Sequence, residues 1–399
     1  MSTEGLRIGI VGAGIAGLTV ANTLIASGAD CHVFEQAGQF ADVGAGIQVA
    51  PNAARVLHRL GLGPSLDAVA VRPRRIEMRR WDDGAVLRST DLEPCAELFG
   101  APYYTVHRAD LHRVLVEHLP CGVVHLGRRC VGAVEGPDGV ALRHSDGSTT
   151  TVDVGIGADG IRSVLRRLVA DDEPTFSGQH IVRGLVPGTA VPELAADPRV
   201  QLWLGPGQHL VCYPVRGGRL ISFGATIPAS TAGDESWTAP GSASELRARY
   251  WDWHPVVDRI LAAAEEVTRW ALHDREVLHR WSTARTTLVG DAAHPMLPFL
   301  AQGANQAIED AMVLARGLRG IATGEVAPAL LGYEELRRAR TEEVHRTSRR
   351  NTQMLHLPDG PEQRERDAVL GRTADVRTQA WLFGHDVTEG WTAEASIAG

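Results

Sequence analysis

The chain has 399 residues, of which 44% are hydrophobic and 22% are charged, and its formal net charge is −8. That length allows two domains, or one large domain with an insertion, and the composition is typical of a soluble globular protein. The negative charge argues against a general binder of nucleic acid or of anionic membranes. All 40 basic residues are arginine, which excludes lysine Schiff-base and P-loop lysine chemistry.

The cysteines and the apolar runs bear on the compartment. Five cysteines without a C-x-x-C pair favour buried thiols in a reducing cytoplasm over disulfides or a zinc site. No uninterrupted apolar run approaches the roughly 18 residues of a membrane span. The apolar start of the chain lacks a basic leader and a cleavage site. We therefore expect a cytoplasmic monomer or homodimer that binds no metal, nucleic acid or membrane.

The first 35 residues predict a β-α-β unit. Residues 6–11 form a short apolar, β-branched run, the spacing of 15–27 is helical and ends at Gly28, and 31–35 form a second strand-like run. Parallel strands with a right-handed crossover are the default for such a unit.

A G-x-G-x-x-G pattern lies between the first strand and the helix, at Gly12, Gly14 and Gly17, with Ala16 inside it. Its context favours a dinucleotide site: a tight turn, a close approach of backbone to a pyrophosphate, and a helix N-terminus that attracts anions. Glu35 ends the second strand, 18 residues after Gly17, where an acid can bind ribose hydroxyls. Such an acid would repel a 2′-phosphate, which favours FAD or NAD over NADP in this cleft.

The rest of the chain changes character several times. A hairpin with a turn at 82–84 is expected over 72–91, and the basic cluster at 72–80 is interpreted as a solvated strand edge. The other expected elements are a helix at 108–119, hairpin turns at 136–139 and 144–147, short strands over 179–223, a polar loop at 230–244, one amphipathic helix at 244–267, a strand at 286–295, a long helix from 306, and a less regular tail after Asn351.

Two further motifs decide between FAD and NAD. "IGADGIRS" (156–163) is a strand that runs into an Asp-Gly turn, and "LVGDAAHPMLPFLAQGANQAIEDA" (288–311) is a strand, a Gly-Asp pair and a loop that leads into a helix. With these motifs in this order, the chain resembles the single-component, FAD-dependent aromatic hydroxylases of the para-hydroxybenzoate hydroxylase class. Within that class it is similar to the salicylate, 3-hydroxybenzoate and 6-hydroxynicotinate hydroxylases. Further matches are "GAGIQVAPNA", "YTVHRADLH", "HLVCYPVRGG" and "WLFGHDV".

The resemblance implies an α/β fold: a Rossmann-like FAD-binding domain of the glutathione reductase type, an inserted antiparallel-sheet substrate domain, and a helical C-terminal segment. We assign residues 1–71, 102–178 and 276–345 to the FAD-binding domain, 72–101 and 179–275 to the substrate domain, and 346–399 to the C-terminal segment.

The resemblance also implies cofactor roles. Asp291 would bind a ribitol hydroxyl, and the backbone around Gln302, Gly303 and Ala304 would hold the flavin at a helix N-terminus, where positive potential stabilises the reduced anion. Arg108 would reach the flavin phosphate or ribitol, and Asp159 would lie near the pyrophosphate. Each acid is alternatively a turn residue or a helix cap, an alternative that stays open for Asp159.

On the substrate side, His209 and Tyr213 lie four apart on one strand, and by family analogy they line the pocket with His209 as the base. His209 is alternatively a packed strand residue. Tyr103 matches another pocket position, and Arg183 either grips a carboxylate or forms a salt bridge on the sheet surface. Gln48 and Phe299 stand where 6-hydroxynicotinate hydroxylases carry a histidine. These departures argue against 6-hydroxynicotinate and favour a plain phenol or a larger ring.

The implied reaction is hydroxylation of a small phenolic, carboxylated aromatic by O₂ through a flavin C4a-hydroperoxide, with NADH or NADPH as co-substrate and with or without decarboxylation. Three alternatives were weighed: hydroxylation of a larger aromatic in secondary metabolism, an NAD-dependent dehydrogenase, and a non-catalytic flavin sensor. A dehydrogenase would leave the second and third motifs unexplained, and a sensor would not oxidise NADH in response to substrate.

Overall fold

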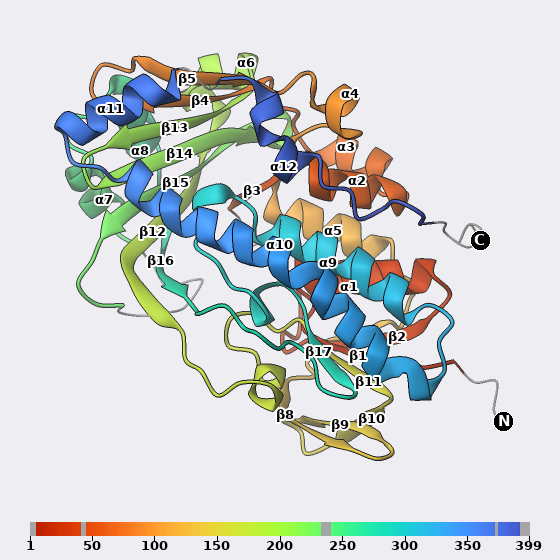
Figure 1. Cartoon of the computed structure of the whole chain (residues 1–399). Helices are drawn as coiled ribbons and strands as arrows, with labels where there is room; N and C mark the ends of the chain where they lie inside the picture. Colours follow the sequence, from red (N-terminus) through yellow and green to blue (C-terminus); the bar gives the residue numbers. More distant parts are fainter. Residues whose placement is uncertain (1–4, 41–44, 233–240, 372–373, 392–399) are drawn as a thin grey trace.

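Two large β-sheets organise the computed structural model, which describes residues 5–40, 45–232, 241–371 and 374–391. One has five strands in the order β17-β11-β1-β2-β7, and the other has seven in the order β16-β12-β15-β14-β13-β4-β5 (Figure 1). The expected α/β class is confirmed. The exact domain limits stay a prediction.

The five-stranded sheet is parallel throughout and carries the predicted β-α-β unit. Its strands are β1 (Arg7–Val11), β2 (Asp30–Phe34), β7 (Val124–His125), β11 (Val154–Gly157) and β17 (Thr286–Leu288). Helix α1 (Ile15–Ala26) joins β1 to β2 and packs against α5 (Arg108–Glu117) and α9 (Gly303–Leu318). Gly28 follows the helix with φ of 85°, so the predicted glycine stop is confirmed.

Two smaller sheets and three short helices complete this half of the molecule. The two predicted hairpin turns join β8 (Cys130–Gly136), β9 (Gly139–His144) and β10 (Thr149–Val152). Strand β3 (Gly46–Val49) pairs with β6 (Tyr104–His107). The helices are α2 (Pro51–Arg59), α3 (Gly63–Val69) and α4 (Cys95–Phe99).

The seven-stranded sheet is antiparallel except for the β13–β4 pair. Its strands are β4 (Arg75–Arg80), β5 (Val86–Asp91), β12 (Thr175–Pro187), β13 (Arg199–Gly205), β14 (Gln208–Val215), β15 (Leu220–Pro228) and β16 (Val267–Asp274). One face is buried against α6 (Pro192–Ala196), α7 (Ala243–Arg249) and α8 (Pro255–Ala262). Strands of the same sheet also pack against Leu297 and Phe299 in the loop before α9 and against Leu355 later in the chain.

Two expectations for this part were wrong. The basic cluster at 72–80 does not form a sheet edge, because β4 pairs with β13 on one side and β5 on the other. Its arginines are neutralised locally: Arg75 and Arg79 both contact Glu77, which is buried. The single helix expected over 244–267 is two helices separated by a turn in which Asp252 has φ of 67°. The polar loop at 230–244 lies partly outside the described residues.

The C-terminal segment is helical, as the resemblance implied. Helix α10 (Val326–Leu355) runs across the molecule from the five-stranded to the seven-stranded sheet, and α11 (Pro361–Leu370) and α12 (Ala380–Phe383) follow it (Figure 1). Near its start, the Tyr333 hydroxyl donates to the Leu288 carbonyl on β17. After its end, His356 contacts His209 on β14.

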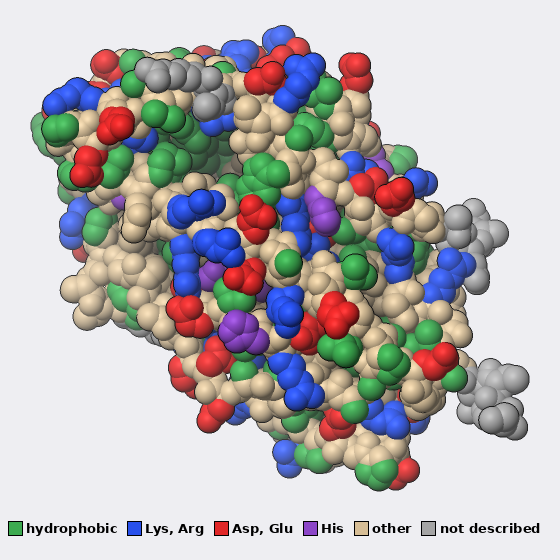
Figure 2. All heavy atoms as spheres, viewed as in Figure 1, with side chains coloured by type: hydrophobic (Ala, Val, Ile, Leu, Met, Phe, Trp, Pro, Cys, Tyr) green, Lys and Arg blue, Asp and Glu red, His purple; other side chains and the backbone are tan. Residues whose placement is uncertain are grey.

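Acidic and basic side chains are interspersed over the face shown in Figure 2, and neither sign dominates it. Within the described part of the chain, no helix is both long enough and apolar enough to cross a bilayer. The cytoplasmic location stays a prediction.

A buried ionic cluster joins α10 to α9. Arg337 is fully buried and contacts Glu309 at 2.6 Å and Asp310 at 2.8 Å. Asp310 also accepts from the Gly290 backbone N–H, and Glu309 accepts from Asn52 on α2. Burial alone would raise the pKa of Asp310, but His294 and Arg337 outweigh it and lower that pKa to about 2.

We predict that Arg337→Met lowers the free energy of unfolding by about 3–5 kcal/mol, because it removes the buried guanidinium that both buried carboxylates contact. Urea unfolding of the purified variant measures this loss. Arg338→Met is the matched control: Arg338 is partly exposed, lies 3.7 Å from Glu334 and donates to the His279 carbonyl at the surface, so its loss should cost at most about 1 kcal/mol. Equal effects of the two substitutions would contradict the assignment.

Candidate active site

The glycines of the first motif have different roles. Gly12 has φ of 102°, and a Cβ there would lie 2.5 Å from the Ala158 carbonyl oxygen. A Cβ on Gly17 would lie 2.0 Å from the Gly12 carbonyl oxygen. Both positions therefore require glycine for the fold itself. A Cβ on Gly14 would meet nothing within 4 Å, so the turn is open at the first residue before α1. That opening, next to a helix N-terminus, fits a pyrophosphate.

Glu35 lies at the end of β2 and braces the same turn. One carboxylate oxygen accepts from the Ala13 N–H and the other from the Ala37 N–H, each at 2.8 Å. The side chain is thus fixed by the backbone while each oxygen keeps a further lone pair for a ribose hydroxyl. His112 on α5 contacts the Ala13 carbonyl from the other side.

Arg108 and Asp291 are two partly buried charged groups that the protein leaves without hydrogen bonds. Within the described residues, neither side chain has a hydrogen bond or an ion pair. Burial lowers the pKa of Arg108 and raises that of Asp291, and each opposes the change in the other. Desolvated charges without direct partners are costly. Their arrangement therefore fits a polar ligand that reaches both.

The loop after Asp291 ends at the start of α9. Ala301 adopts φ of 52°, which is unusual for a residue with a side chain, and Gln302 precedes the first helical turn without a side-chain cap. The Gln302 side chain points away from that end, where its oxygen accepts from Asn52 and Gln306. The backbone at Gly303 and Ala304 therefore stays available to bind a ligand.

Asp159 follows β11 and lies beside the glycine turn, since its Cα is 3.0 Å from where a Gly12 Cβ would be. One of its oxygens accepts from the Val164 N–H at 2.7 Å, so it caps the turn that follows. The other oxygen is buried without a partner. Burial raises the pKa of this carboxyl. Asp159 therefore acts as a turn residue. Its second oxygen suits a contact with the cofactor, and that role stays a prediction.

Three of the predicted substrate residues, Arg183, His209 and Tyr213, lie on strands of the seven-stranded sheet. Arg183 on β12 pairs with Gly224 on β15, which in turn pairs with Val211 on β14. Because Gly224 has no side chain, none stands between Arg183 and Val211 at this level of the sheet. The Arg183 guanidinium is 5.3 Å from the Trp270 ring centre. Burial lowers its pKa, and Tyr213 partly offsets that effect.

Gln48 joins the two predicted tyrosines. The Tyr103 hydroxyl donates to the Gln48 amide oxygen at 2.7 Å, and the same amide hydrogen-bonds Tyr213. Burial raises the pKa of both phenols, that of Tyr213 to about 12. Both hydroxyls therefore stay protonated at neutral pH and can act as hydrogen-bond donors.

His209 and Phe299 meet further along the sheet face. Their rings pack edge to face with centres 5.5 Å apart, which brings β14 against the loop before α9. His209 is buried, and burial together with His356 holds its pKa well below the usual value. Its Nδ1 atom lies 2.7 Å from Nε2 of His356, a residue that the sequence analysis did not select.

The structure thus gathers the predicted residues into two groups. The first surrounds the glycine turn and the Asp291 loop, and the second lies on the sheet face, where Arg108 is close enough to lower the pKa of Arg183. Sequence reasoning missed His356, His112 and the Arg337 cluster. Of these, only His112 carried a signal, because it follows Arg108 by one helical turn.

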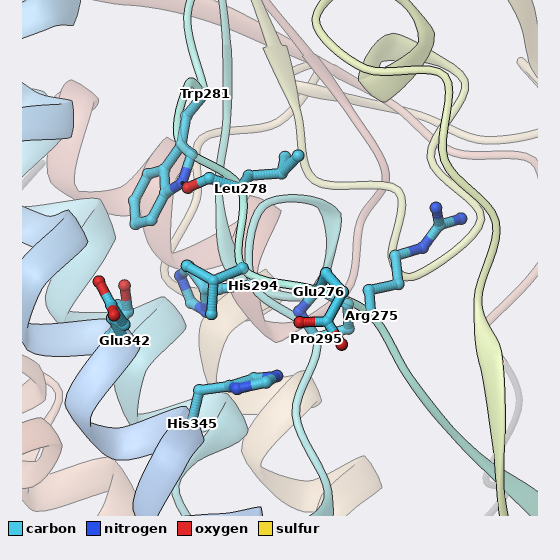
Figure 3. Close-up of a pocket in the computed structure, with 10 residues that line it drawn as sticks. Arg275, Glu276, Leu278, Trp281, His294, Pro295, Glu342 and His345 are labelled. Carbon is cyan, nitrogen blue, oxygen red and sulfur yellow. Dashed lines mark hydrogen bonds between the residues drawn. The ribbon is translucent and has the colours of Figure 1, made fainter.

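The pocket in Figure 3 is lined by none of the predicted site residues. It lies between α10, which supplies Glu342 and His345, and the segments that carry Trp281 and His294 (Figure 3). Its volume is about 10 Å³, enough for one water but not for an aromatic ring. His294 Nδ1, which is buried without a protein partner, lines it. We assign it no substrate.

Comparison with known proteins identifies the class. A family model described as an FAD binding domain matches residues 6–348. 3-Amino-4-hydroxybenzoate 2-monooxygenase PtmB3 from Streptomyces platensis is 50% identical over 381 residues, 95% of this chain and 96% of the relative.

Two solved structures are also similar. A salicylate hydroxylase substrate complex has a TM-score of 0.82 and 30% identity, covering 97% of each chain. Klebsiella pneumoniae HpxO complexed with FAD and uric acid has a TM-score of 0.84 and 28% identity, covering 96% of this chain and 97% of that one. The protein is therefore an FAD-dependent aromatic hydroxylase. It belongs to the FAD-binding family that this model describes, as the sequence resemblance indicated.

The residues present fit FAD. The open turn at Gly14, the unpaired Arg108 and Asp291, and the uncapped start of α9 offer groups suited to a pyrophosphate, a polyol and a flavin ring. The individual assignments remain predictions.

We expect Asp291→Ala to weaken FAD binding at least about tenfold, because a buried polyol hydroxyl would lose its acceptor. Fluorescence titration of the apoprotein with FAD measures the affinity. Asp138→Ala, at the exposed tip of the β8–β9 hairpin, is the control and should bind FAD like the wild type. A fully loaded Asp291→Ala protein with unchanged affinity would contradict the ribitol role.

Proposed function

We propose that this hydroxylase acts on 3-amino-4-hydroxybenzoate, or on a benzoate that carries the same amino and phenol groups, and inserts oxygen beside the carboxylate. The observation that carries the proposal is 50% identity to three 3-amino-4-hydroxybenzoate 2-monooxygenases over at least 95% of this chain. The co-substrates proposed are O₂ and NADH or NADPH.

The sheet face supplies groups that suit such a substrate. Arg183 offers a planar cation for the carboxylate, in a position where burial strengthens charge–charge attraction. Tyr213, held by Gln48, offers a neutral hydroxyl. His209 is a neutral imidazole at pH 7, able to take the phenol proton and make the ring more nucleophilic.

When bound, FAD supplies the oxygen activation, which no side chain here can perform. The protein's own task is to orient the ring, exclude water and accept one proton. The edge-to-face packing of Phe299 on His209 places an apolar ring at the point where the flavin loop meets the substrate face.

A decarboxylating reaction is the second candidate, supported by the similarity to the salicylate hydroxylase structure. The two reactions differ in product. Oxygen insertion that keeps the carboxylate raises the substrate mass by one oxygen atom, whereas decarboxylating hydroxylation also removes CO₂.

The experiment is a screen of NADH and NADPH oxidation by the FAD-loaded enzyme with 3-amino-4-hydroxybenzoate, salicylate and 2-aminophenol, with mass analysis of each product. We expect stimulation and coupled hydroxylation with 3-amino-4-hydroxybenzoate, and carboxylate retained. Stimulation by salicylate alone, with loss of CO₂, would contradict the proposal.

Arg183→Met should raise KM for 3-amino-4-hydroxybenzoate about 10- to 100-fold, because the carboxylate loses a charge-assisted partner. The wild type should prefer this substrate to 2-aminophenol, which lacks the carboxylate, and the variant should lose that preference. Arg269→Met, an exposed change on neighbouring β16, is the control and should leave KM unchanged. Preserved discrimination in Arg183→Met would remove Arg183 from carboxylate recognition.

A further inference from the structure

His209 does not face the substrate region alone. A second imidazole, His356, stacks on it with ring centres 5.0 Å apart and an interplanar angle of 26°. The two rings are joined through Nδ1 of His209 and Nε2 of His356, at 2.7 Å. Both also pack edge to face against Phe299. His356 directly follows α10 in a segment for which the sequence indicated no function.

The outer side of His356 is held by acceptors. The Thr352 carbonyl hydrogen-bonds the His356 ring, and a carbonyl can only accept. The Gln179 amide lies 2.9 Å from His356 Nδ1 through its nitrogen, while its own oxygen is buried without a partner. The two ends of such an amide are assigned from the hydrogen-bond network. Because the Thr352 carbonyl can only accept, we assign the Gln179 oxygen to the side that faces Nδ1, where it too accepts from the ring N–H.

This arrangement determines the proton positions on both rings. With its proton on Nδ1, His356 presents a lone pair at Nε2. His209 must then carry its proton on Nδ1 and donate it across the 2.7 Å contact. Nε2 of His209, which has no hydrogen-bond partner in the described part of the chain, is left as the free acceptor.

We propose that His356 is the positioning residue for His209: it fixes the tautomer in which His209 Nε2 accepts the substrate's phenol proton, and it shares the resulting positive charge. The inference rests on the proposed function. In the step itself, the phenol O–H bond breaks and an N–H bond forms at His209 Nε2. The His209 Nδ1–H proton stays within the hydrogen bond to His356, so one proton is held by two imidazoles.

Electrostatics near the pair is consistent with this role. Burial lowers the pKa of His356 to about 4, and burial together with His356 holds the pKa of His209 well below its usual value, so the pair is neutral at pH 7 before substrate binds. The neighbouring Thr226, Gln179 and Tyr250 groups are uncharged. Thr352 and Gln353 line an open groove of about 290 Å³, so the outer end of the pair lies close to solvent.

The first test reads the tautomer directly. In FAD-loaded enzyme with ¹⁵N-labelled histidine, two-bond couplings identify which nitrogen of His209 is protonated, with the signal assigned by its loss in His209→Asn. We expect the proton on Nδ1. A proton on Nε2 would overturn the inference, and this measurement needs no substrate, so it is independent of the proposed function.

The second test uses two variants of His356. His356→Leu removes the acceptor, and His356→Gln keeps one. We expect kcat to fall about 10- to 100-fold in His356→Leu, with FAD affinity unchanged, and His356→Gln to recover most of it. His279→Leu, an exposed histidine elsewhere, should match the wild type.

Ionisation of a bound probe distinguishes positioning from packing. 4-Hydroxy-3-nitrobenzoate is a phenol whose ionised form absorbs at longer wavelength, so its titration can be followed in the complex. We expect its apparent pKa in the enzyme to rise by about one unit or more in His356→Leu and to return toward the wild-type value in His356→Gln. Identical titrations in wild type and His356→Leu would overturn the inference. Failure of the probe to bind the wild type would instead overturn the proposed substrate class.

Discussion

Arg337 is the constraint on which the active-site architecture depends. A fully buried guanidinium must be paired, and the carboxylates of Glu309 and Asp310 that pair it are themselves fully buried. Once paired, Asp310 still binds the Gly290 N–H, which precedes Asp291, and Glu309 still binds Asn52. Satisfying one buried charge thus fixes the Gly-Asp turn, the first turns of α9 and helix α2 relative to one another.

The requirement that a buried charge be paired also explains the cofactor site, where two charged groups await a partner. Arg108 and Asp291 are partly desolvated, but among the described residues neither side chain has a hydrogen-bonding partner. Such groups weaken the folded apoprotein, and binding FAD would supply what they lack. Cofactor affinity and stability are therefore coupled here. A protein of this design should be more stable with FAD than without it.

The sequence predicted what depends on local pattern. The β-α-β unit, the hairpins at 82–84, 136–139 and 144–147, and the glycine turn are each encoded within about 30 residues, and the fold class followed from them. The wrong predictions concern features that depend on contacts between residues far apart in the sequence. Strand β4 is interior only because β13, more than 110 residues later, pairs with it. The break at Asp252 reflects packing that helical periodicity cannot show.

The same distinction applies to the site. Gly12, Glu35 and Asp291 lie in motifs, so they could be selected from the sequence. His356 lies in no motif, and only the fold brings it 147 residues along the chain to His209. Its partner Gln179, on another strand, is 177 residues away in the sequence. Hydrogen-bonded pairs of this kind leave no local signal, because their members are spaced by topology and not by a helical or strand repeat.

Helix α10 connects the buried Arg337 cluster to the histidine pair. Arg337 anchors it to the flavin side, and His356, just beyond its last residue, contacts the substrate side. At 1.5 Å per residue, the 19 residues between them span about 28 Å. A helix of this length is stiff, so it sets the separation between the Gly-Asp turn and the histidine pair. Hydroxylation needs the substrate ring within a few tenths of an ångström of its reactive position. The geometry of the reaction therefore depends on a helix that contains no residue of the three cofactor motifs.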